Sequence, residues 1–150
     1  MSPIQKLSGH PTGPVLLAKD YLDAPSLRGM RDRIAPGGYL PGNPFNRVID
    51  RALGLAWLAR TDIYITQVFA AIKPAGRSAS VPVAHRRASF EAVGQHELKG
   101  RRVLALGPEA ARICAEFGVP HVAVASHPSA RGPGMTDAAK AEALAAALTS

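Results

Sequence analysis

The sequence predicts a single α/β domain, a three-layer αβα sandwich around a four-stranded, mostly parallel sheet. Its length of 150 residues suits one domain with one hydrophobic core. Short apolar runs alternate with segments that repeat apolar residues at helical spacing, which is typical of βαβ units. Thirteen prolines and fourteen glycines punctuate these segments, which indicates tight turns rather than disorder.

Four apolar runs are expected to form the strands, at residues 14–20, 62–69, 101–107 and 121–126. The second run is rich in the β-branched and aromatic residues that favour strands. The first dozen residues are expected to form a loose arm. The stretches 21–44 and 70–82 are rich in glycine, proline and charge and are expected to be loops, the first long enough to be functional or mobile.

Four helices are expected between and after these strands. The first spans residues 45–58, and its apolar face comprises Phe45, Val48, Ile49, Ala52, Leu53 and Ala56. The second spans 82–96 despite Gly94. The third starts at Pro108, a favoured first helical residue, and stops at Gly118. The last follows Thr136 as its N-cap.

The composition indicates which partners and which compartment to expect. Eighteen lysines and arginines against eleven acids leave a net charge of +7, which favours a polyanion such as nucleic acid or simply keeps the surface soluble. Cys114 is the only cysteine and is expected to be a small buried hydrophobe. With no signal core and no apolar run of membrane-spanning length, we expect a cytoplasmic protein without membrane contact.

Polar residues stand where the predicted strands end. Asp20 follows the first strand, Gln67 lies near the end of the second, and His127 and Ser129 follow the fourth. Ligands of such folds bind beyond the carboxyl ends of the strands. A carboxylate, an amide and an imidazole are therefore expected to converge on one crevice.

Five stretches occur in the order found in the uracil-DNA glycosylase superfamily, which the chain resembles over about residues 15–131. They are "VLLAKD", "GNPF", "DIYITQVFAAIKPAGR", "RRVLALGPEAA" and "VAVASHPSARG". The "HPS" that follows a strand behind "VLALGPEAA" is the most specific of them. The resemblance implies a monomeric, monofunctional DNA-repair glycosylase that flips a base out of DNA and needs neither cofactor nor metal.

The resemblance also implies roles for individual residues. Asp20 would activate or orient water, and His127 would stabilise the departing base. Gln67 would read the base, and Phe45 would stack on it. Contacts to DNA are expected from Ser129, Arg131, Lys73 and Arg77, with Arg131 or Met135 filling the gap left in the stack.

The chain departs from the family pattern at two of these places. Ala18 and Lys19 replace the usual Gly and Gln before Asp20, and Asp23 is an alternative carboxylate. Gln67 stands where Asn is common, so the base read there can be uracil, thymine, hypoxanthine or a damaged base. The single cysteine excludes the iron–sulfur cluster of one branch of the family.

Each of these residues also has an ordinary structural explanation. Asp20 can bond turn amides, His127 can be a turn histidine, and Phe45 can belong to the core. Lys73 and Arg77 can be plain surface charges. At the level of the whole chain, the alternatives are a non-catalytic uracil- or DNA-binding relative and an unrelated small-molecule enzyme on a flavodoxin-like sheet.

Overall fold

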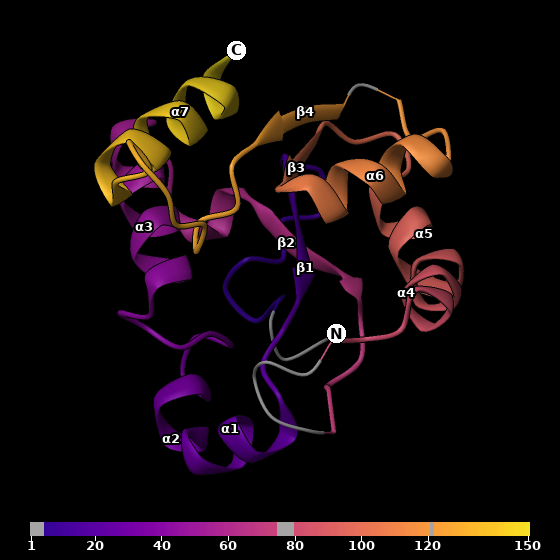
Figure 1. Cartoon of the computed structure of the whole chain (residues 1–150). Coiled ribbons are helices and arrows are strands. Elements are labelled where there is room, and N and C mark those ends of the chain that lie inside the picture. The colour runs from indigo at the N-terminus through magenta and orange to yellow at the C-terminus, as the bar shows by residue number, and fades with distance from the viewer. Residues whose placement is uncertain (1–4, 75–79, 121) are drawn as a thin grey trace.

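The computed structural model describes residues 5–74, 80–120 and 122–150. Its sheet consists of β1 (Val15–Asp20), β2 (Tyr64–Phe69), β3 (Val103–Leu106) and β4 (Val122–Ala125). All neighbouring strands are parallel, and their order is β2-β1-β3-β4 (Figure 1). The predicted four-stranded parallel sheet of an αβα sandwich is therefore confirmed, although most of the strands are shorter than their apolar runs.

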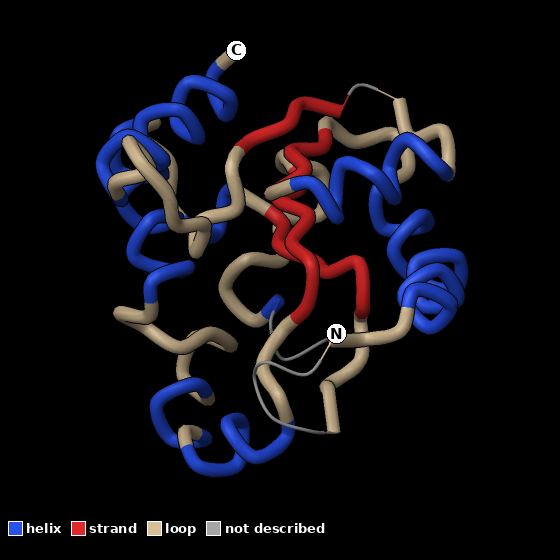
Figure 2. The backbone as a smooth tube through the Cα atoms, in the orientation of Figure 1, coloured by secondary structure: helices blue, strands red, loops and turns tan. Residues whose placement is uncertain are grey.

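Helices cover both faces of this sheet (Figure 2). One face packs against α3 (Pro44–Leu55) and α7 (Asp137–Thr149), and the other against α4 (Val83–Ser89), α5 (Gln95–Leu98) and α6 (Pro108–Glu116). Alternate residues of the central strand β1 serve the two cores: Leu16 faces α3 and α7, and Leu17 faces the opposite layer. Burial on both faces makes Val15–Ala18 of β1 and the whole of β3 continuously apolar rather than alternating, whereas β4 is partly exposed.

The predicted helix over residues 82–96 is present but is not a regular α-helix. Between α4 and α5 the chain makes a π-helical turn, η3 (Phe90–Gly94). Phe90 is fully buried, and a Cβ on Gly94 would lie 2.5 Å from its ring. Gly94 is thus the residue that lets the helix pass over this phenyl ring.

The prediction of a loose N-terminal arm is wrong for residues 5–12. Gly9 forms an antiparallel bridge with Tyr64, and Arg101 Nη2 donates to the carbonyl of His10 at 2.7 Å. Gln5 Nε2 donates to Glu97 at 3.0 Å. The physical reason is that β2 lies at the edge of the sheet, where unpaired backbone groups favour a covering segment.

The prediction of an unstructured 21–44 loop is also wrong in part. It contains α1 (Ala24–Gly29), capped by the Asp23 carboxylate, and α2 (Arg31–Ile34). A further short turn, η2 (Arg60–Asp62), precedes β2. Helices of one turn are too short to produce a periodic apolar pattern, so tertiary contacts decide whether they form.

Two smaller predictions are confirmed. The Thr136 hydroxyl accepts from the Ala139 N–H at 3.1 Å and caps α7. Cys114 is buried, and this burial raises the pKa of its thiol to about 11. Among the described residues, no helix combines the length and apolarity needed to cross a membrane.

Candidate active site

A pocket of about 350 Å³ lies at the carboxyl ends of β1 and β2. Six of the eight site residues predicted from the sequence line it: Asp20, Phe45, Gln67, Lys73, His127 and Ser129. They come from five separate parts of the chain, so the parallel sheet brings together side chains more than a hundred residues apart. The expected convergence of carboxylate, amide and imidazole is present.

Gln67 reaches the pocket because of its place on the edge strand. It pairs with Ala18 of β1, while the preceding Thr66 points to the other face and bonds Glu97. The side chain is buried, with 5% of the residue exposed. Its Oε1 has no hydrogen-bond partner among the described residues. A buried acceptor of this kind favours a ligand that brings an N–H group.

His127 is held as a neutral imidazole with a defined tautomer. Burial lowers its pKa below the ordinary value of 6.5, and the nearby charge of Asp20 opposes this only in part. Its Nδ1 accepts the Ser129 backbone N–H at 3.2 Å, so the ring proton lies on Nε2. The ring centroid is 5.5 Å from that of Phe45. An Nε2–H donor is therefore available to a ligand.

Two residues outside the predicted site fix the histidine turn. Lys140 of α7 donates to the carbonyl of Pro128 at 2.6 Å and to that of Ala130 at 3.1 Å. Gly107 has a φ of 92°, and a Cβ there would lie 2.9 Å from the His127 Cβ. The glycine at the end of β3 thus lets the histidine approach the sheet. The sequence "LALG" carried this signal, but without the fold its target was unknown.

Asp20 is not a free carboxylate. The Lys73 ammonium lies 3.0 Å from its Oδ1, and the two side chains are 18% and 6% exposed. The alternative that Lys73 is a plain surface charge is wrong, because its side chain is buried in the pocket wall. The alternative carboxylate, Asp23, caps α1 and does not line the pocket.

The pocket lining also includes Tyr39, Asn46 and Arg60, which were not predicted from the sequence. The Arg60 guanidinium stacks on the Tyr39 ring, 3.5 Å from its centroid. It also donates to Asp50 at 2.7 Å and to Asn46 at 2.8 Å. Tyr39 is an aromatic residue in the Gly- and Pro-rich segment before α3, and it was the sequence feature that could have indicated this part of the pocket.

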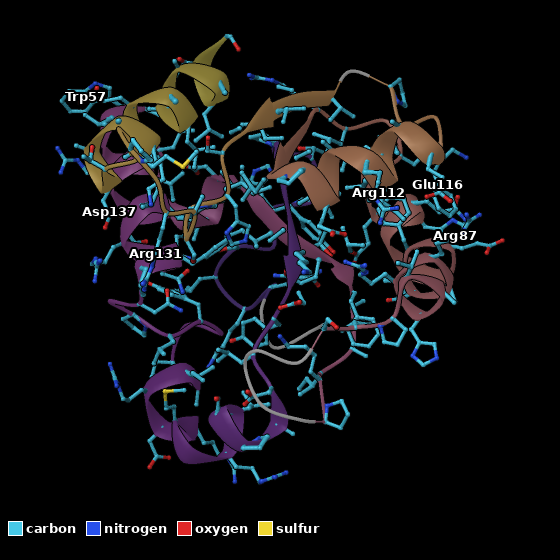
Figure 3. The ribbon with its side chains drawn as sticks, in the orientation of Figure 1. Trp57, Arg87, Arg112, Glu116, Arg131 and Asp137 are labelled. Atoms are coloured by element: carbon cyan, nitrogen blue, oxygen red, sulfur yellow. The ribbon has the colours of Figure 1, made fainter. Side chains whose placement is uncertain are left out.

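The predicted residues Arg131 and Met135 do not line the pocket. Arg131 is exposed and is not among the pocket-lining residues; it lies on the loop before α7, on the opposite side of the view in Figure 3 from Arg87. Met135 is also exposed. Arg77 lies outside the described residues. Within the described ranges, no group of three or more His, Cys, Asp and Glu side chains is arranged to hold a metal ion.

Comparison with models of known protein families finds no match, and a search of curated proteins finds no relative. The pocket and the sequence motifs are therefore the observations that support a function for this protein.

Proposed function

We propose that the protein removes uracil, or a related deaminated base, from DNA by hydrolysing the N-glycosidic bond of an extruded nucleotide. The observation that carries this proposal is the unpartnered, buried acceptor of Gln67 in the same pocket as Asp20 and His127. The pocket volume of about 350 Å³ is at the small end of the range for ligand sites, which suits one base.

Recognition depends on which edge the base presents. Uracil offers an imino N–H next to a carbonyl oxygen, and the Gln67 amide complements both. Cytosine has an acceptor in place of the imino N–H, so it would leave the Gln67 oxygen unpaired. A buried group without its partner costs about 1–3 kcal/mol, which is enough to discriminate between the bases. Phe45 contributes an aromatic surface to the same pocket.

Bond breaking places negative charge on the departing base and positive charge on the sugar. The Nε2–H of His127 stabilises the first by donating to the carbonyl next to the breaking bond. A preorganised donor of this kind contributes about 2.7–4 kcal/mol. The Asp20 carboxylate stabilises the sugar cation and orients the attacking water. Neither role requires His127 to be protonated.

DNA must deliver the nucleotide to this pocket, because a base inside a duplex cannot be reached. The net charge of +7 attracts the phosphate backbone at long range. Ser129 at the pocket and Arg131 on the following loop are the proposed contacts to flanking phosphates. Lys73 adds a positive charge to the pocket next to Asp20, and Arg77 is a further proposed phosphate contact.

The test is release of uracil from single-stranded and U:G oligonucleotides, followed by detection of abasic sites. We expect His127→Ala to lower the rate by about 10²–10³-fold and Asp20→Asn to lower it as well. His85→Ala is the matched control, because His85 is exposed on α4 away from the pocket. Thymine and hypoxanthine substrates define the base. No abasic product at micromolar enzyme would overturn the proposal.

A second candidate is a non-catalytic relative that binds uracil-containing DNA. The ion pair between Lys73 and Asp20 favours it, since the ammonium occupies an oxygen that would otherwise orient water. Gel-shift binding that prefers uracil DNA, without abasic product from the same samples, supports this candidate. Product formation by the wild-type protein and not by His127→Ala excludes it.

A further inference from the structure

Lys73 is a lysine inside a pocket rather than on the surface. Its side chain is 6% exposed, and its ammonium contacts the Asp20 carboxylate at 3.0 Å. Lysine is rarely buried unless it is paired, because removing its charge from water is costly. A lysine held in a ligand pocket is also the residue that forms imines with carbonyl compounds.

The backbone joins this lysine to the segment that follows β1. Lys73 forms a parallel bridge with Asp23, and its carbonyl accepts the Ala24 N–H at 2.8 Å. The segment after β2 is thereby joined to the start of α1. The segments that carry the amine and the carboxylate are thus joined by main-chain hydrogen bonding.

We propose that Lys73 and Asp20 act as an amine–carboxylate pair that cleaves DNA at abasic sites. This inference rests on the proposed function, since it uses the same pocket for the sugar that remains after base release, and it replaces the monofunctional enzyme that the resemblance implies with a bifunctional one. If Asp20 lies beside C1′ of that sugar, an amine 3.0 Å from Asp20 lies within reach of the same carbon.

The first step forms an imine. The Lys73 ammonium passes a proton to Asp20, and the free amine attacks the C1′ aldehyde of the ring-opened sugar. A C–N bond forms, and the aldehyde oxygen leaves as water with the proton returned by Asp20 and the proton lost from nitrogen. The product is a protonated imine beside a carboxylate that is ionised again.

The second step breaks the strand. Asp20 takes a proton from C2′, the C–H electrons form a C2′–C3′ double bond, and the C3′–O bond breaks with its electrons on the phosphate oxygen. Asp20 passes the C2′ proton to the leaving phosphate, and water hydrolyses the protonated imine, which restores the Lys73 ammonium and releases an unsaturated aldehyde. The sequence consumes no oxidant, reductant or cofactor.

The experiment uses an end-labelled oligonucleotide with a preformed abasic site, so base removal is not required. The wild-type protein is expected to cut the strand on the 3′ side of the abasic site and, with borohydride, to form a covalent adduct. Peptide mass spectrometry is expected to place the adduct on Lys73. An adduct on Lys19, which also lines the pocket, or on the N-terminal amine would overturn the assignment.

Lys73→Arg keeps a cation next to Asp20 but cannot form an imine, and we expect adduct and cleavage to fall by about tenfold or more. Lys99→Arg is the matched control and should retain both, because Lys99 is exposed and does not line the pocket. Thermal unfolding of each variant verifies the fold. Wild-type protein that releases uracil but neither cuts nor traps abasic DNA overturns this inference and leaves the proposed glycosylase intact. Cleavage of abasic DNA without uracil release does the reverse.

Discussion

The Gln67 amide is buried at a cost that a bound base would remove. Its Oε1 finds no partner among the described residues, and leaving such a group unpaired costs about 1–3 kcal/mol. A site built for a hydrogen-bonding ligand has this character, since the ligand supplies the missing donor. Stability and function therefore make opposite demands on this single side chain.

Replacing Gln67 with Met tests this conflict. Met has a similar shape without polar atoms, so we expect the unfolding free energy to stay the same or rise by about 1 kcal/mol. Uracil release and binding should nevertheless be lost. Denaturant unfolding and the abasic-site assay measure the two quantities. A variant destabilised by more than about 1 kcal/mol would mean that the amide has a structural role instead.

His127 makes stability depend on pH. Its pKa is lowered in the folded state, so below the ordinary value of 6.5 the unfolded chain binds the proton more readily. Its contribution is complete above about pH 6.5 and is lost as the pH falls toward the folded-state pKa. We expect the wild type to lose more Tm than His127→Gln between about pH 7 and 5. Equal losses in the two proteins would contradict the neutral imidazole.

At the scale of secondary-structure elements, the site depends on how strands end. β4 stops at Ala125, and the following turn is held by the Lys140 ammonium from α7 and by contact with Gly107 after β3. The histidine is thus positioned by three elements at once. The proposed chemistry needs this precision, because a misplaced donor loses most of its effect.

Gly107→Ala should therefore lower activity by displacing His127, in addition to lowering stability through backbone strain. Gly107 has φ 92° and ψ 173°, a combination found almost only for glycine, and Gly100 has φ 71°, so alanine at either position is strained by about 1–3 kcal/mol. Only at Gly107 would the added Cβ meet His127, at 2.9 Å; at Gly100 no atom lies within 4 Å. We expect Tm to fall in both variants, and further in Gly107→Ala, but a large loss of uracil release only in Gly107→Ala. Equal activities would remove Gly107 from the positioning of His127.

At the scale of the whole molecule, binding to DNA is expected to be dominated by charge. The chain carries a net +7, and each phosphate contact contributes to the salt dependence of affinity. The exposed loop between β4 and α7 places Arg131 close in sequence to the pocket residues His127 and Ser129, whereas Arg87 of α4 pairs with Glu116 of α6 (Figure 3). The two arginines therefore form a matched pair for testing which side faces DNA.

Arg131→Ala should weaken binding to uracil DNA and reduce the slope of log affinity against log salt by about one. Arg87→Ala should leave the slope unchanged. Fluorescence anisotropy at several salt concentrations provides both numbers. A wild-type affinity that does not depend on salt would contradict every nucleic-acid proposal made for this chain.

Local pattern was sufficient for much of the fold and for most of the candidate site. Apolar periodicity predicted the strands, the helices and the N-cap Thr136, because these depend on neighbours a few residues apart. The topological rule that parallel strands present their carboxyl ends together placed Asp20, Gln67 and His127 at one edge. All three line the same pocket.

Long-range packing decided what local pattern cannot encode. The N-terminal segment covers β2, Lys73 pairs with Asp20, and Arg60 stacks on Tyr39 in the pocket wall. From sequence alone a lysine is expected at the surface. Only the fold shows that the Lys73 ammonium lies 3.0 Å from the Asp20 carboxylate. The sequence by itself determined the strands and the chemical groups at their ends, because the spacing of apolar residues along the chain predicts which of them are buried. Only the tertiary structure decided which of those groups are paired, buried or open to a ligand, because that depends on contacts between distant segments.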